Sequence, residues 1–292
     1  MKSIYSLLGA ACLVSACSKK LTVDAPDLTV TPQSITIKLG DTAKFMFAGS
    51  AGNITFYSGE AGYKYVNKDR TSATGIPKLS FTSYAQYGTQ TNTLKLLAVS
   101  GLTTLDSTSV VNAAWTDITS RATLSTGTDN TASGNIDLSD IAVSGKSMCI
   151  AYKYNGTTGS TQKTWTIKNF TVTNTLTDGA VATISGLSDA AWTAYKIKGT
   201  AAWAITSTQF QIVGGAATAT TNESWVVSKP LDLTKIAPDI GVAIKSVGTA
   251  SMKEYDYLYT KAGTYTATFV IFNNTIDDQK TSIQEFTITV TP

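Results

Sequence analysis

The side chains that could perform chemistry in this chain are few, because it contains no histidine and only three cysteines. The lack of histidine excludes Ser-His-Asp and Cys-His catalysis and any zinc site that needs imidazole. Three cysteines are too few for a four-cysteine zinc site. The sequence contains neither a GxxxxGK[ST] phosphate loop nor a GxGxxG dinucleotide motif after a strand. Catalysis would therefore have to use carboxylates, tyrosine, lysine or the backbone.

Carboxylates alone could support a glycosidase, which needs one carboxyl group as acid and a second as base or nucleophile. The chain contains four glutamates, Glu60, Glu223, Glu254 and Glu285. No spacing in the sequence places two of them together. We therefore predict that the protein is not an enzyme.

The cysteines are predicted to have different fates. Residues 4–16 are mostly small or apolar and are too few for a membrane span of about 20 residues. With Lys2 before them they indicate a secretory signal. The segment ends in VSAC, which resembles a bacterial lipobox, in which Cys17 is lipidated and becomes the first mature residue. An ordinary signal peptide with an incidental cysteine is the alternative. Cys149, in the apolar pattern SMCIAYKY, is predicted to be a small buried hydrophobe.

Aromatic side chains are the main candidates for binding. Sugars stack their C–H faces on flat rings, while amides and carboxylates bond the hydroxyl groups. Two tryptophans lie among small residues, and two tyrosines lie in the polar segment SYAQYGTQTN. The predicted glycan-binding residues are Trp192, Trp203, Tyr84 and Tyr87. The alternative for each tryptophan is a place in the core, which we expect for Trp165 and Trp225.

Composition narrows the class of partner. Charged residues make up 15% of the chain, against about 25% in ordinary domains. The net charge of +3 is not concentrated in any cluster, so a nucleic-acid partner, which needs a basic stripe, is excluded. A highly anionic glycan would also require several Lys or Arg residues. A neutral polysaccharide or oligosaccharide is the expected ligand.

Strands must position these side chains, because apolar and polar residues alternate along most of the chain. Two strands are expected at 35–37 and 45–47, across a turn at Gly40-Asp41. Segments 264–271 and 284–290 show the same period of two near the C-terminus. Almost no stretch has a 3.6-residue period, so the predicted fold class is all-β.

The C-terminal segment YLYTKAGTYTATFVIFN (257–273) resembles the closing hairpin of a polycystic-kidney-disease (PKD) type immunoglobulin-like domain. The expected opening strands lie far upstream, where ITFYSGE resembles that family's WDFGDG turn at Phe56 and Gly59. This resemblance implies one discontinuous sandwich formed by residues 28–70 and 241–292. Neither end alone has enough strands to bury its apolar faces.

The segment between these ends has its own strand patterns, including GNIDLSD, SMCIAYKYNG and KTWTIKNFTVTN. They resemble the carbohydrate-binding-module-like jelly rolls of secreted bacterial proteins. ESWVVSKPLDLT resembles a strand that usually comes earlier, which indicates an altered strand order. The predicted division is a signal peptide at 1–16, a lipidated tether at 17–27, the discontinuous sandwich at 28–70 and 241–292, and an inserted jelly-roll sandwich at 71–240.

This resemblance also bears on calcium. In many such jelly rolls the last strand carries an acidic residue that helps to hold a structural calcium ion, but Lys168 occupies that place here. Asp137 and Asp140 could form a different site, although two carboxylates rarely supply the six to eight oxygen ligands of calcium. No cofactor is therefore predicted.

The lipobox and the two sandwiches together resemble a family of Bacteroidetes lipoproteins of unassigned biochemical function. The resemblance is strongest at TQTNTL, AWTDITSRATLSTG, TWTIKNF and the final hairpin. It implies an outer-membrane lipoprotein, at the cell surface rather than the periplasmic face, that captures glycan beside outer-membrane glycan-uptake proteins. The alternative is a structural or adhesive surface module with no glycan ligand.

Overall fold

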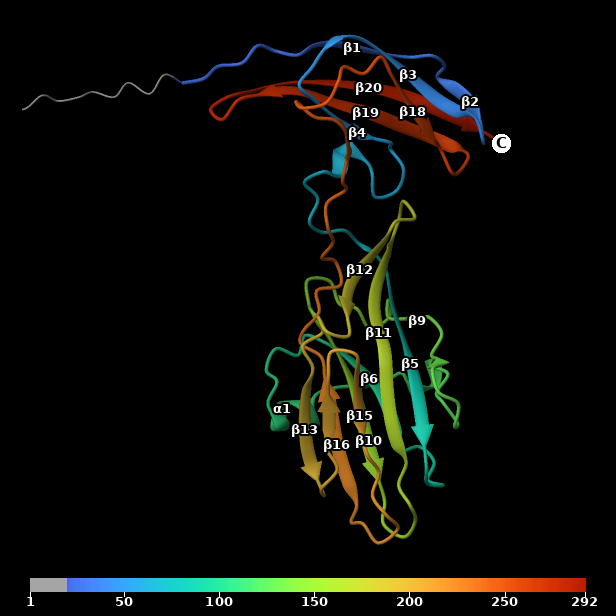
Figure 1. The fold of residues 1–292 in the computed structure, drawn as a ribbon. Helices are drawn as coiled ribbons and strands as arrows, with labels where there is room; N and C mark the ends of the chain where they lie inside the picture. Colours follow the sequence, from blue (N-terminus) through green and yellow to red (C-terminus); the bar gives the residue numbers. More distant parts are fainter. Residues whose placement is uncertain (1–19) are drawn as a thin grey trace, which may run out of the picture. The chain divides into compact units, whose positions relative to one another are not determined.

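The computed structural model describes residues 20–292, so the predicted signal peptide and Cys17 lie outside the described residues. The described chain consists mainly of strands, which confirms the all-β class (Figure 1). Its described residues divide into unit 1, residues 20–65 with 240–292, and unit 2, Val66–Asp239. The sequence placed these boundaries at 70/71 and 240/241. The short helices are η1 (Tyr65–Asn67), α1 (Ser107–Asn112) and η2 (Thr119–Arg121).

Unit 1 contains a three-stranded and a five-stranded sheet, and each combines strands from both ends of the chain. The first has the order β1 (Asp27–Pro32), β3 (Thr42–Ser50) and β18 (Glu254–Leu258). The second has the order β17 (Val242–Lys245), β4 (Asn53–Tyr57), β19 (Gly263–Asn274), β20 (Gln279–Thr291) and β2 (Thr36–Lys38). Phe45 of the first sheet contacts Phe56 and Phe269 of the second, with ring centroids 5.8 and 4.9 Å apart.

The two strands predicted on either side of Gly40-Asp41 are present, but they do not pair with each other. β2 pairs in parallel with the end of β20, whereas β3 pairs with β1 and β18. Gly40, with φ +98°, makes the turn, but the turn passes the chain from one sheet to the other. Gly59 is a second constrained position, since at φ +84° an added Cβ would lie 2.6 Å from the Thr266 carbonyl oxygen.

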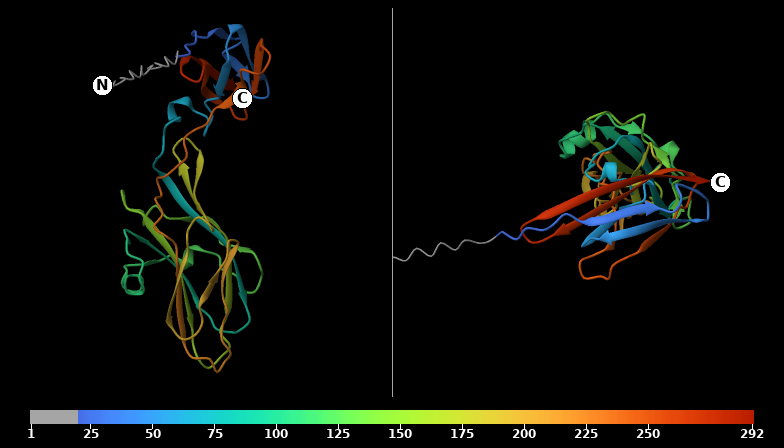
Figure 2. Two further views of the ribbon diagram at one scale, coloured as in Figure 1. Left: turned by 60° about the vertical axis from the view of Figure 1, so that its left-hand side comes forward. Right: turned by 90° about the horizontal axis from the view of Figure 1, so that it is seen from above.

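Unit 2 is built from a five-stranded and a seven-stranded sheet (Figures 1 and 2), and one core lies between them. The five-stranded sheet has the order β13 (Thr193–Lys198), β16 (Asn222–Val227), β10 (Met148–Gly156), β6 (Leu94–Ser100) and β7 (Thr116–Asp117). The seven-stranded sheet runs from β14 (Trp203–Ile205) through β15 (Gln209–Ile212), β11 (Thr164–Leu176) and β5 (Gly75–Gln86) to β8 (Thr131–Ala132), with β12 (Val181–Gly186) beside β11 and β9 (Ile136–Asp137) beside β5.

The predicted interior residues of unit 2 are confirmed. Trp165 is 5% exposed and lies in the core between the sheets. Trp225 and Cys149 lie on the opposite face of the five-stranded sheet, where they pack with Trp115 and Val110 from the segment that contains α1. Burial raises the pKa of the Cys149 thiol to about 11, so this side chain is an inert apolar group rather than a nucleophile.

Candidate functional site

Trp203, one of the four predicted sugar platforms, belongs to the core. Its side chain is 5% exposed, its ring centroid lies 5.5 Å from that of Phe210 in a T-shaped arrangement, and its indole N–H donates to the carbonyl of Ser224 at 3.3 Å. The predicted exposure of Trp203 is therefore wrong. The reason is the pairing of β14 with β15, which aligns Trp203 with buried Ile212 and turns both inward.

Trp192 is half-buried and packs against the same core. Its ring lies 4.8 Å from the rings of Phe170 and Phe210, and 5.9 Å from that of Tyr152. The indole N–H donates to the carbonyl of Leu187 at 3.0 Å. With three core rings packed around it, Trp192 is not offered as a flat platform, and the stacking role predicted for it finds no support in this geometry.

Tyr84 has a different environment, because it lies on the outer face of the seven-stranded sheet. It is aligned across the sheet with Thr166 of β11, which is aligned in turn with Gln211 of β15. The next residues in register, Trp165 and Ile212, are buried in the core. Since successive side chains of a strand point to opposite faces, Tyr84, Thr166 and Gln211 form an outward row, here called the polar row.

Hydrogen bonds fix the side chains on this face. The Gln211 amide donates to the Thr166 hydroxyl at 2.8 Å, and the Asn169 amide donates to the Thr82 hydroxyl at 3.1 Å. All four side chains are uncharged, and each amide keeps a carbonyl oxygen that can accept. Thr166 is only 3% exposed, so the polar groups that a ligand can reach here are those of Gln211, Asn169 and Thr82. The face therefore combines one aromatic ring with amides and hydroxyls, the groups that recognise sugar rings and sugar hydroxyls.

Tyr87 lies just beyond the end of β5 and is 72% exposed. It has φ +54° and is followed by Gly88 at φ +62°. A bulky residue rarely adopts this left-handed conformation, which costs on the order of 1–3 kcal/mol. The adjacent hollow, of about 420 Å³, is lined by Tyr87 with threonines, glycines and the Lys163 side chain. Tyr87 is thus held in solvent at the same end of β5 as the polar row.

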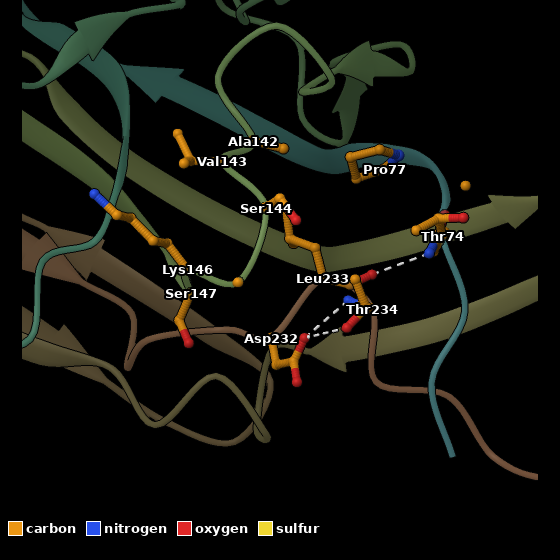
Figure 3. A pocket seen from close by; sticks show the side chains of 13 residues that line it. Thr74, Pro77, Ala142, Val143, Ser144, Lys146, Ser147, Asp232, Leu233 and Thr234 are labelled. Carbon is orange, nitrogen blue, oxygen red and sulfur yellow. Dashed lines mark hydrogen bonds between the residues drawn. The ribbon is translucent and has the colours of Figure 1, made fainter. Parts of the chain in front are cut away.

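A second hollow, of about 280 Å³, lies at the start of β5 and the end of β11 (Figure 3). Its side chains include Pro77, Leu233, Ser144 and Lys146. Asp232 is the only carboxylate in the lining among the described residues. The hydroxyl and N–H of Thr234 donate to this carboxylate at 2.8 and 2.9 Å, and they hold the pKa of Asp232 below its ordinary value. One carboxylate bonded in this way does not form an acid–base pair.

The glutamates Glu60 and Glu223 are bonded to other side chains of the fold. Glu60 accepts a hydrogen bond of 2.5 Å from the Tyr257 hydroxyl in unit 1. Glu223, in unit 2, lies 2.9 Å from the Lys153 ammonium and accepts from the Trp225 indole at 3.0 Å. The other two glutamates belong to strands of unit 1. Neither hollow described above is lined by two carboxylates.

The acidic residues considered for calcium have protein partners. Asp140 forms a bidentate pair with Arg121, with both N···O distances 2.7 Å, and this contact lowers the pKa of Asp140. Asp137 accepts from the backbone N–H of Ser139 at 2.8 Å. Lys168, at the position where the resemblance places an acid, has its ammonium 3.3 Å from Asp129. Among residues 20–292, no three His, Cys, Asp or Glu side chains gather in a metal-binding group.

Sequence reasoning found Tyr84 and Tyr87 but missed their neighbours Thr166 and Gln211. The alternation in QFQI, residues 209–212, was a usable signal, because it places both glutamines opposite two buried apolar residues. Nothing in the sequence aligns Gln211 with Tyr84, since β5 and β15 meet only through β11.

No helix in the described part of the chain is long and apolar enough to cross a membrane. Comparison with curated proteins gives no significant match, and comparison with solved structures gives none either. Residues 16–192, more than half of the chain, match the model of a family described as a domain of unknown function (DUF5017). The protein therefore belongs to the DUF5017 family.

Proposed function

We propose that unit 2 binds a neutral glycan without cleaving it. The observation that carries this proposal is the outer face of the seven-stranded sheet, where Tyr84 is aligned with Thr166 and Gln211 and the exposed Tyr87 lies beyond the strand end. A sugar chain laid over this face meets aromatic rings and uncharged hydrogen-bonding groups together.

The charges beside this face favour a neutral ligand. The Lys168 ammonium is already 3.3 Å from Asp129, and the Lys163 ammonium donates to the carbonyl of Gly88 at 3.4 Å. An anionic glycan would have to compete for both groups. The proposal that the protein is non-catalytic is supported by the glutamates, since Glu60 and Glu223 lie in different units and are bonded to other side chains.

The proposed setting is the outer membrane. Cys17 would carry the lipid, and unit 2 would capture polysaccharide at the cell surface beside glycan-uptake proteins. The lipobox VSAC and the resemblance to lipoproteins support this setting. A structural or adhesive surface module remains the competing function, and it predicts no glycan retention by the same face.

Removal of either ring, the half-buried Tyr84 or the exposed Tyr87, should weaken glycan binding. Tyr84→Thr keeps a residue suited to a strand, and Tyr87→Asn keeps a residue that tolerates the left-handed backbone. Loss of one stacked ring should cost about 0.5–1.5 kcal/mol of binding free energy from the stacking contact, together with the contribution of the apolar area that the ring buries. The total corresponds to a roughly tenfold weaker affinity. The measurement is retardation of the chain 21–292 in gels that contain neutral polysaccharides, after a glycan array has chosen them.

Tyr63→Ala is the matched control, because Tyr63 is 40% exposed and belongs to unit 1. It should bind as the unchanged chain does. Ser144→Phe fills the hollow at the start of β5 and should also leave retention unchanged. If Ser144→Phe abolishes retention while the two tyrosine variants do not, the polar row is not the site. If no polysaccharide is retained, the structural module is the better description.

The lipid anchor has a separate test. Cys17→Ala should convert a protein that partitions into the detergent phase into one that stays in the aqueous phase. The physical reason is the loss of acyl chains, each buried CH₂ of which contributes about 0.8 kcal/mol to membrane binding. The check is detergent phase separation followed by immunoblotting of both forms. Equal partitioning of the two forms would contradict lipidation of Cys17.

A further inference from the structure

The segment that follows the lipobox is bonded to unit 1 rather than free. The backbone N–H of Leu21 donates to Asp277 at 3.0 Å, and that of Val23 donates to Asp278 at 3.2 Å. The Thr275 hydroxyl donates to the carbonyl of Leu21 at 2.7 Å. These partners form the tip of the β19–β20 hairpin, residues 275–278, and Figure 2 shows the N-terminal segment beside it.

A fourth bond extends the same attachment. The Asn273 amide donates to the carbonyl of Asp24 at 3.1 Å. The Val23 N–H is the largest cause of a lowered pKa at Asp278, with Lys280 and Lys20 acting in the same direction. Both carboxylates of the tip thus accept hydrogen bonds from this segment. The attachment combines side chains of the tip with the backbone of residues 21–24, so it does not depend on one contact.

This attachment limits where a lipid on Cys17 can be. Cys17 precedes Leu21 by four residues, and a fully extended chain covers at most about 3.6 Å per residue, or roughly 14 Å. Any membrane that holds acyl chains on Cys17 must therefore lie within that reach of the hairpin tip, in every conformation of the intervening residues.

The surface at this end of unit 1 suits a membrane interface. Ile276, at the tip itself, is 89% exposed, and Leu21 beside it is 54% exposed. A singly exposed apolar residue needs no explanation by itself, but these two lie at the point from which the anchor leaves. Lys20 beside Leu21 and the carboxylates of Asp277 and Asp278 beside Ile276 carry opposite charges, so docking rests on the two apolar side chains.

We propose that the tip of the β19–β20 hairpin is a membrane-docking surface that inserts Ile276 into the leaflet carrying the anchor. Leu21 enters the interface with it, and the bonds to residues 21–24 keep the docked end in place. The inference rests on the lipid anchor of the proposed function but not on glycan binding. The end of unit 1 that carries the β19–β20 hairpin tip is then the end nearer the membrane.

The opposite end of unit 1 supplies a control position. Leu39 is 45% exposed, and its N–H donates to the carbonyl of Thr291 at the far end of β20. β20 has 13 residues, so the two positions are separated by roughly 40 Å at about 3.3 Å per residue. The single-cysteine labels are Ile276→Cys and Leu39→Cys. Cys149 needs no replacement, because its buried thiol is unreactive at neutral pH.

The experiment uses the acylated full chain in vesicles of phosphatidylethanolamine and phosphatidylglycerol, with a nitroxide on either cysteine. Collision with oxygen, which concentrates in lipid, is compared with collision with a water-soluble nickel chelate. The ratio of oxygen to nickel collisions should be severalfold higher at position 276 than at position 39. Replacing Asn273, Thr275, Asp277 and Asp278 together by alanine removes all four bonds to residues 21–24. It should reduce the ratio at 276 towards that at 39, because the tip is then released from the tether.

Equal ratios at the two positions in acylated protein would overturn the docking surface and leave the anchor intact. An unchanged ratio after loss of all four side chains would show that the bonds to residues 21–24 do not hold the tip there, which also overturns the proposal. Absence of acyl mass on Cys17 would overturn both the anchor and the docking surface. Glycan retention by the chain 21–292 is measured separately, so its failure is distinguishable from all three outcomes.

Discussion

Replacement of Trp203 by alanine is expected to lower the free energy of unfolding of unit 2 by about 3–5 kcal/mol, the range for a buried tryptophan. The ring is 5% exposed and packs on Phe210, so its removal leaves a cavity between the sheets. At about 2–4 °C per kcal/mol for a unit of this size, the melting temperature should fall by roughly 6–20 °C. Differential scanning calorimetry of the chain 21–292 measures this.

Two further variants test whether the effect comes from burial of the Trp203 ring. Trp203→Phe keeps most of the apolar volume but loses the N–H bond to Ser224, and its effect should be smaller. Val213→Ala changes a residue that is 63% exposed, close to the same strands, and should leave the melting temperature within about 1 °C. A Trp203→Ala protein that melts normally but no longer retains glycan would contradict the core assignment.

Replacement of Arg70 by alanine is expected to have the second largest effect. Its guanidinium lies 2.9 Å from Asp239, whose side chain is only 3% exposed. These residues lie near the two ends of unit 2, so the pair joins the ends of that unit. The change takes an opposite charge away from a buried carboxylate, and loss of one partner of a buried ion pair typically costs about 3–5 kcal/mol. Since Arg70 is 23% exposed, we expect the lower end of this range, a loss of about 3 kcal/mol in the free energy of unfolding. Urea denaturation measures it.

The mechanism predicts a rescue. Arg70→Met combined with Asp239→Asn removes both charges and should recover most of the lost stability. The Asn67 amide, which donates to Asp239 at 3.3 Å, can still bond the new side chain. Lys44→Ala is the control, because it breaks an exposed ion pair. The Lys44 ammonium lies 3.4 Å from Asp256, and the two side chains are 42% and 46% exposed. This change should lower the free energy of unfolding by at most about 1 kcal/mol. A double variant no more stable than Arg70→Ala would reject this explanation.

The sequence by itself determined the class of fold and much of its interior. The period of two in segments 264–271 and 284–290 marks the buried residues Ala267, Phe269 and Ile288, because a strand turns alternate side chains to opposite faces. The same local pattern located Trp165 and Trp225 in the interior of unit 2. These assignments need no knowledge of which strands are neighbours.

The candidate site was only partly accessible in the same way. Tyr84 and Tyr87 stand in a polar segment, so their composition indicated a surface position. Trp203 stands in a short strand among small residues, and three residues do not define a face. Its partner β15 decides that Trp203 points inward beside Ile212. Sequence context of this kind cannot distinguish a core ring from an exposed platform.

Pairings between distant strands were decided by the tertiary structure alone. β2 joins the C-terminal strand β20 in parallel instead of the nearby β3, and the polar row exists because β11 lies between β5 and β15. Residues 21–24 likewise find their partners about 250 positions later in the chain, at 273–278. Alternation specifies which face of a strand is apolar, but register and neighbour are selected by how all the apolar faces are buried together.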